Sequence, residues 1–279
     1  MKQLINDITA QLLAAYPEDE ARSLAWWIVE EETGLSRSQI ICGCKDTTNF
    51  PNVQEIIDRL LHFEPIQYIF GHTLWCGLDL KVTPATLIPR PETAELVEKI
   101  SNFKFQISNC RVLDIGTGTG CIALALKNAH PDWQVTGIDI SPEAIEVAKE
   151  NAIRNGLDVD FHVADIFDSN GKMVNGKCTN GKWFDIVVSN PPYICEKEKA
   201  SMRPNVLDYE PSTALFVPDT DPLLFYRRIA NLRLGKHLFY EINEAYAAQM
   251  QQLLLDAGYT DVQLSRDIYG KHRIIEGKI

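Results

Sequence analysis

The chain has 279 residues, of which 45% are hydrophobic and 23% are charged, as in a globular protein with one large domain or two smaller ones. Its 27 basic and 38 acidic side chains give a formal net charge of -11, which argues against direct binding of nucleic acid or anionic lipid. The N-terminal segment lacks the uninterrupted apolar core of a secretory signal, and no apolar run is long enough to span a bilayer. We therefore expect a cytoplasmic location and no membrane partner.

The seven cysteines and six histidines are scattered, without a C-x-x-C pair or an H-E-x-x-H motif. This spacing predicts neither a disulfide framework nor a metal site.

Residues 1–72 show the periodicity of successive helices. Apolar residues recur at helical spacing over 4–13 and 53–61, a richer apolar segment covers 21–29, and Ser36 is placed to cap a short helix that ends at Ile41. We predict a small helical N-terminal domain without a chemical motif of its own.

Residues 73–90 change to short extended pieces, 75–82 and 87–88, interrupted by glycine and proline. This pattern predicts a β-hairpin connector. Pro91 and Glu92 then form a favourable helix start, because proline suits the first helical position and an acid suits the first turn.

From residue 91 to 279 the pattern predicts an α/β domain with a doubly wound sheet, whose ligands bind at the carboxyl ends of the strands. Two segments, 166–182 and 195–220, show little regular pattern; we interpret the first as a surface excursion and the second as a substrate loop. Strands are expected at 110–115, 134–139, 159–163, 184–189, 236–241 and 260–264, and helices at 121–130, 142–155, 221–231 and 244–257.

A glycine-rich turn follows the first of these strands and opens a helix. It runs Asp114, Ile115, Gly116, Thr117, Gly118, Thr119, Gly120. Glycines permit a tight turn and allow a ligand to approach the backbone amides, so the turn indicates a nucleotide-like ligand. Cys121 stands where a dinucleotide fingerprint has glycine or alanine, which disfavours NAD.

Two acids end the next two strands. Asp139 is placed to accept hydrogen bonds from the hydroxyls of an unphosphorylated ribose, although it also precedes a helix that Ser141 is expected to cap. Asp165 is a candidate partner for an adenine amino group, or equally a residue that forms an Asx turn.

The segment Asn190, Pro191, Pro192, Tyr193 ends the strand at 184–189. Its prolines make the loop stiff and remove two backbone donors, so the Asn190 oxygen and nearby carbonyls can accept both hydrogens of a planar NH2 group while Tyr193 offers a stacking face. This suits methylation of a conjugated nitrogen, whose lone pair is nearly non-nucleophilic and must be aimed at an electrophilic methyl group. A simple strand-ending turn is the structural alternative.

With these motifs in order, the chain resembles the class I S-adenosylmethionine-dependent methyltransferases that act on an NH2 nitrogen, and more narrowly the peptide chain release factor N5-glutamine methyltransferases. The resemblance covers about residues 60–279. It is carried by segments 65–71, 87–93, 114–120, 137–141, 189–194, 209–211 and 267–273.

The resemblance implies a class I methyltransferase Rossmann-like fold and three parts: an N-terminal recognition domain at 1–72, a connector at 73–90 and a catalytic domain at 91–279. It implies methylation of the glutamine in the Gly-Gly-Gln loop of release factors, with effects on translation termination. We further expect a monomer whose recognition domain and residues 195–220 meet the release factor, while segment 87–92 lines the cofactor site.

Cofactor residues, for S-adenosyl-L-methionine and its product S-adenosyl-L-homocysteine, would be Gly116, Thr117, Gly118, Thr119, Gly120, Asp139, Asp165, Ile166 and Asn190. Catalytic and substrate-binding residues would be Asn190, Pro191, Pro192 and Tyr193, with Pro192 holding substrate only.

Three alternatives remain at this point. A DNA adenine N6-methyltransferase would bind a flipped adenine with the same acceptors, but the acidic net charge does not favour binding of duplex DNA. A non-catalytic nucleotide-binding protein would leave the segment at Asn190 unexplained. A nicotinamide oxidoreductase is disfavoured by the glycine spacing.

Overall fold

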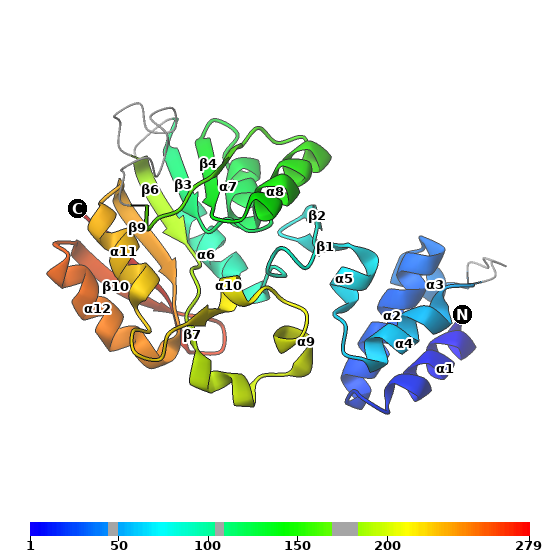
Figure 1. Cartoon of the computed structure of the whole chain (residues 1–279). Coiled ribbons are helices and arrows are strands. Elements are labelled where there is room, and N and C mark those ends of the chain that lie inside the picture. The colour runs from blue at the N-terminus through cyan, green and yellow to red at the C-terminus, as the bar shows by residue number, and fades with distance from the viewer. Residues whose placement is uncertain (44–49, 104–108, 169–183) are drawn as a thin grey trace. The chain divides into compact units, whose positions relative to one another are not determined.

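The computed structural model describes residues 1–43, 50–103, 109–168 and 184–279. The chain divides into two compact units (Figure 1). One comprises Met1–Phe70 with Arg203–Tyr209, and the other comprises Gly71–Met202 with Glu210–Ile279.

The first unit is helical, as the periodicity predicts. Apolar faces of its helices share one core that includes Ile8, Ile28 and Ile57. Ser36 and Gln39 form a reciprocal capping box at the third helix. The helices are α1 (Lys2–Leu12), α2 (Glu18–Thr33), α3 (Arg37–Ile41), α4 (Val53–Leu61), α5 (Ile66–Phe70) and α9 (Pro204–Leu207).

A distant piece of chain joins this unit at α9. Arg203 lies 3.0 Å from a carboxylate oxygen of Glu20, and the Tyr209 hydroxyl donates to the His62 carbonyl at 2.9 Å. The sequence pattern did not associate this segment with the N-terminal helices, because only side-chain pairing over a long separation places it there.

The second unit begins with a β-hairpin of β1 (His72–Trp75) and β2 (Leu78–Lys81), paired antiparallel. Cys76 and Gly77 both have positive φ at its turn. The hairpin predicted for residues 73–90 is therefore present, but residues 87–88 form no strand. The Ile88 amide instead donates to a Glu210 carboxylate oxygen at 3.3 Å, and Ile88 is buried in a loop.

The central sheet of this unit has seven strands in the order β10-β11-β9-β6-β3-β4-β5. Its first five strands in chain order pair in parallel, and β11 pairs antiparallel with both neighbours. The strands are β3 (Arg111–Ile115), β4 (Gln134–Asp139), β5 (Asp160–Val163), β6 (Phe184–Ser189), β9 (Gly235–Glu241), β10 (Thr260–Arg266) and β11 (His272–Lys278).

The sequence analysis missed β11. Buried Glu276 interrupts its apolar pattern and lies 3.0 Å from Lys99, so the strand contains a polar residue at a core position.

Helices cover both faces of the sheet (Figure 1). Val112 and Leu113 show how this arises, since neighbouring strand residues enter opposite cores. One core includes residues of α6 (Pro91–Ser101), α7 (Cys121–Ala129) and α8 (Pro142–Asn155), and the other includes residues of α11 (Leu224–Leu232) and α12 (Ala247–Asp256). The helices predicted at 221–231 and 244–257 are present but begin later than predicted, at Leu224 and Ala247. The short 3-10 helix η2 (Glu244–Tyr246) precedes α12.

The segment 195–220 has more regular structure than its sequence suggested, so the expectation of an irregular loop is wrong there. It contains η1 (Glu196–Ser201), α9, α10 (Ser212–Leu215) and β8 (Phe216–Val217), which pairs with β7 (Ile194–Cys195). Of the other expected loop, 166–182, only residues 166–168 are within the described chain.

No helix in the described parts of the chain is long and apolar enough to cross a membrane. Among the same residues, no three His, Cys, Asp or Glu side chains gather in a group that could hold a metal ion.

Candidate active site

The predicted site residues converge because three neighbouring parallel strands end together. Ile115 of β3 pairs with Ile138 of β4 on one side and with Ser189 of β6 on the other. The Ser189 hydroxyl also donates to the Ile115 carbonyl at 2.7 Å. The residues that follow these strands therefore emerge at one edge of the sheet.

The glycine turn is held against the end of β4. The amides of Gly116 and Thr117 donate to the Ile138 carbonyl at 2.9 and 3.0 Å. Gly116 and Gly118 have φ of 72° and 53°, and a Cβ at either position would meet nothing within 4 Å. Their backbone is thus strained for other residues and open to a ligand. Gly120, in contrast, packs closely against Phe161.

Asp139 links the strand end to this turn. One carboxylate oxygen accepts from the Gly118 amide at 2.9 Å and the other from the Ser141 amide at 3.0 Å. Burial raises the pKa of Asp139, and the hydrogen bonds from the backbone amides oppose that shift. Each oxygen has a further lone pair with which it can accept a ligand hydroxyl. Ser141, not Asp139, caps α8 by accepting from the Ala144 amide.

Asp114 and Thr117 form the buried support of the turn. Asp114 is fully buried, and its Oδ2 accepts from the Thr117 hydroxyl at 2.6 Å. Burial raises the pKa of Asp114 to about 7, while the hydroxyl bond opposes that rise. The side chain of Thr117 therefore stabilises the glycine turn from its buried side.

One cavity brings most of the predicted site residues together. Its empty space measures about 890 Å³, a figure that includes space open to solvent. Its walls include the predicted residues Gly116, Gly118, Asp139, Asp165, Ile166, Asn190, Pro191 and Pro192. Four predicted residues do not line it: Thr117, Thr119, Gly120 and Tyr193.

Asp165 forms the Asx turn that the sequence analysis gave as its alternative role. Its Oδ1 accepts from the Phe167 amide at 2.7 Å, which is an Asx-type bond. It also lines the cavity beside Ile166, so it retains acceptor capacity for a ligand.

Asn190 and Tyr193 meet a buried carboxylate. Asn190 Nδ2 lies 3.3 Å from Thr93 Oγ1, which donates to Glu241 Oε2 at 2.6 Å. The Tyr193 hydroxyl donates to Glu241 Oε1 at 3.3 Å. Burial raises the pKa of Tyr193, and the nearby negative charge of Glu241 raises it further. Tyr193 thus presents its hydroxyl to the carboxylate.

The segment 87–92 contributes less to the cavity than expected. Leu87 lines it, whereas the Arg90 guanidinium lies 2.6 Å from buried Glu210. This ion pair joins two segments that carry the family resemblance and are distant in the sequence. Pro211, next to Glu210, lines the cavity.

Several cavity residues received no individual site role in the sequence analysis. They are mostly apolar or small side chains from loops and helices, and such residues look like ordinary core positions. They are Ala85, Thr86, Ile140, Ala144, Ala164, Phe167, Pro211, Thr213, Ala214, Phe225 and Ile229.

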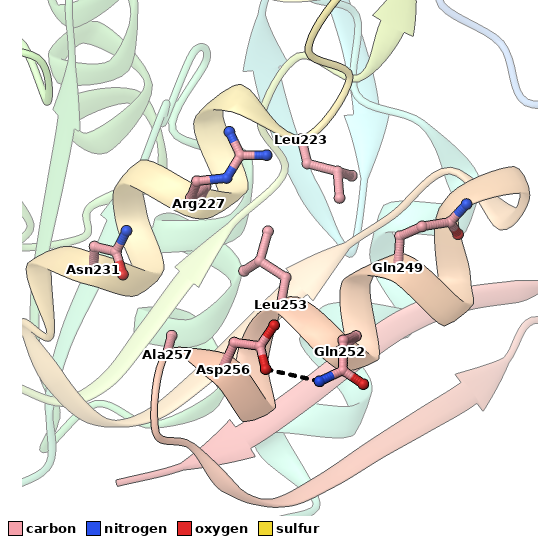
Figure 2. Close-up of a pocket in the computed structure, with 8 residues that line it drawn as sticks. All are labelled: Leu223, Arg227, Asn231, Gln249, Gln252, Leu253, Asp256 and Ala257. Atoms are coloured by element: carbon pink, nitrogen blue, oxygen red, sulfur yellow. Dashed lines mark hydrogen bonds between the residues drawn. The ribbon is translucent and has the colours of Figure 1, made fainter.

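A second hollow lies between α11 and α12 (Figure 2). It is lined by polar and aliphatic side chains, among which Gln252 donates to Asp256 at 2.7 Å. None of the predicted site residues lines it. The cavity at the strand ends is therefore the candidate active site.

Two family models match the chain. A model described as methyltransferase domain matches residues 106–252, and one described as PrmC N-terminal domain matches residues 3–71.

Curated relatives match over nearly the whole chain. A release factor glutamine methyltransferase of Bacteroides thetaiotaomicron is 42% identical over 99% of this chain and 99% of its own length. One of Flavobacterium psychrophilum is 38% identical over 95% of this chain and 94% of its own. Among solved structures, a methyltransferase from Pyrococcus furiosus superposes with a TM-score of 0.50 at 19% identity, covering 81% of this chain and 98% of its own, which shows the shared fold.

Proposed function

The chain belongs to the release factor glutamine methyltransferase family, and we propose that it methylates the side-chain nitrogen of the glutamine in the Gly-Gly-Gln loop of release factors. The methyl donor would be S-adenosyl-L-methionine, and the product would be S-adenosyl-L-homocysteine. Modification of that loop would tune translation termination. The observation that carries this proposal is the single cavity lined by Gly118, Asp139 and Asn190.

The chemistry of the cavity lining supports this donor. Asp139 can accept from both ribose hydroxyls, and the open backbone at Gly116 and Gly118 leaves room for close approach. Phe167 and Ile140 give an apolar wall for the adenine ring, with Asp165 as an acceptor for its amino group. When bound, S-adenosylmethionine supplies a methyl group on a sulfonium sulfur.

Asn190 and the stiff loop after it would hold the glutamine amide. The lone pair on the nitrogen of the glutamine amide is delocalised. The loop must therefore fix both N–H bonds and turn one face of that nitrogen toward the methyl carbon. Positive charge grows on nitrogen as the N–C bond forms and the S–C bond breaks, and the Asn190 oxygen stabilises that charge. The extra proton then leaves to water, and no strong base is needed beforehand.

The helical unit would recognise the release factor. The chain divisions 1–72, 73–90 and 91–279 are proposed as recognition domain, connector and catalytic domain. The observed units support a slightly different grouping, since Arg203–Tyr209 belongs with the N-terminal helices. We therefore propose that α9 and those helices form one recognition part.

The decisive experiment uses tritiated S-adenosylmethionine with three substrates: an unmodified release factor, the same factor with its loop glutamine replaced, and duplex DNA. We expect label only in the unmodified factor. Label that persists after replacement of the glutamine would refute the proposed acceptor, and label in DNA would establish the adenine methyltransferase instead.

A further inference from the structure

The hydrogen bonds behind Asn190 form a chain that ends in a buried acid. Asn190 follows β6, Thr93 lies in α6 and Glu241 ends β9. The Thr93 oxygen lies 3.3 Å from Asn190 Nδ2 and 2.6 Å from Glu241 Oε2. Thr93 and Glu241 are each 2% exposed, so neither relies on water for its partners.

The Thr93 hydroxyl fixes the donor-to-acceptor order of these hydrogen bonds, because it has only one hydrogen to donate. Glu241, when ionised, can only accept, so it takes the Thr93 hydrogen. The Thr93 oxygen is then left as an acceptor toward Asn190, which must offer its NH2 group. The amide oxygen of Asn190 lies on the opposite side of its amide carbon and is the atom left for the substrate.

Three neighbouring groups favour the ionised, accepting form of Glu241, although its pKa as a whole is raised. Burial raises its pKa, and the charge of Glu92 adds to that rise. The hydrogen bonds from Thr93 and Tyr193 and the positive charge of Arg273 oppose the rise. The Tyr226 hydroxyl also donates to the Glu241 backbone carbonyl at 2.9 Å, which holds the end of β9 in place.

We propose that Thr93 and Glu241 are positioning residues that set the orientation of the Asn190 amide, so that its oxygen rather than its NH2 group meets the acceptor substrate. This inference rests on the proposed role of Asn190 and deepens it. An oxygen at this position selects for a substrate that carries N–H bonds, namely a carboxamide, over the isosteric carboxylate.

Two substitutions interrupt or reverse the chain. Thr93→Val keeps the shape of the side chain but removes its hydroxyl. In Glu241→Gln the new amide NH2 group can donate to Thr93, so the Thr93 hydrogen is free to donate to the Asn190 oxygen. The Asn190 amide then adopts the flipped orientation, with its NH2 group toward the substrate. For each variant we expect kcat to fall by about 10- to 100-fold, as for loss of one oriented partner, with KM and cofactor affinity within about twofold of wild type. Thr93→Ser, which keeps the hydroxyl, should restore most of the activity.

The control is Thr136→Val, which removes a buried hydroxyl from β4 outside the cavity and should leave kcat unchanged. Melting temperatures with and without S-adenosylhomocysteine establish that each variant is folded and binds cofactor. If Glu241→Gln does not fold, the comparison of Thr93→Val with Thr93→Ser decides alone, because serine retains the one hydrogen that the argument requires.

The combination with Asn190→Ala separates this inference from the proposed function. We expect Thr93→Val to cause no further loss of kcat in an Asn190→Ala background, because the two residues act as a unit. If Asn190→Ala keeps its turnover, the proposed role of Asn190 fails. If Asn190→Ala loses turnover while Thr93→Val and Glu241→Gln keep theirs, or if the losses add, the positioning role alone is overturned.

Discussion

The carboxylate of Asp139 accepts a hydrogen bond from the backbone amide of Gly118 at 2.9 Å. The acid that ends β4 and the glycine turn that follows β3 are therefore one structure, and a ligand that contacts one contacts a surface shaped by both. The second oxygen of Asp139, bonded to the Ser141 amide at 3.0 Å, also connects this structure to the start of α8.

Asp139→Ala should weaken cofactor binding by about 10- to 100-fold, the effect of losing hydrogen bonds to a charged group, with kcat at saturating cofactor within about twofold of wild type. Isothermal titration with S-adenosylhomocysteine measures the affinity. Glu146→Gln, an exposed change on α8, is the matched control. Unchanged affinity in Asp139→Ala would remove Asp139 from the cofactor site.

Asn190→Ala should lower kcat by on the order of 100-fold or more while the affinity for S-adenosylhomocysteine barely changes, because the lost oxygen acts mainly in the transition state. Single-turnover labelling of the release factor measures the rate, and titration measures the affinity. Equal losses in both quantities would mean that Asn190 acts through cofactor binding and not on the reacting amide.

Gly137→Ala should destabilise the fold by about 1 to 3 kcal/mol, as for an overpacked core. A Cβ there would lie 2.5 Å from Phe161 Cε1 and 2.8 Å from Thr117 Oγ1, directly beneath the glycine turn. Urea unfolding measures the loss. In the double variant with Phe161→Leu the cost of the added methyl group should shrink, and a cost that stays the same would contradict the steric explanation.

Asp114 should make folding stability depend on pH. Burial raises its pKa from the ordinary value of 3.8 to about 7 in the folded protein. Its contribution to stability is therefore fully present below the pKa of the unfolded chain and is lost as pH rises through the folded pKa. The contribution changes by up to about 1.4 kcal/mol per pH unit within that window.

Asp114→Asn, which cannot ionise, removes this dependence. We expect its free energy of unfolding, relative to wild type, to increase between pH 5 and pH 7, as urea unfolding at the two pH values would show. A constant difference between the two proteins would mean that Asp114 does not titrate in this range.

Local sequence was sufficient for most of the individual parts. The glycine turn and Asn190 each follow a strand, and Asp139 ends one. The residues of these strands specify them locally, and parallel pairing of consecutive strand-helix units brings such strand ends together. The expected helices of residues 1–72 follow from apolar periodicity alone. These features depend on neighbours in the chain, so a single sequence reveals them.

Tertiary structure alone decided which of those residues face the cavity and what lies behind them. Thr93 and Glu241 are 148 residues apart, Arg90 and Glu210 are 120 apart, and β11 holds a buried carboxylate where a core strand would be expected to be apolar. Each depends on pairing between charged or polar groups that burial makes obligatory, since an unpartnered polar group in the interior is costly. Periodicity records which residues are buried but not which distant partner satisfies them, and that partner here determines the orientation of Asn190.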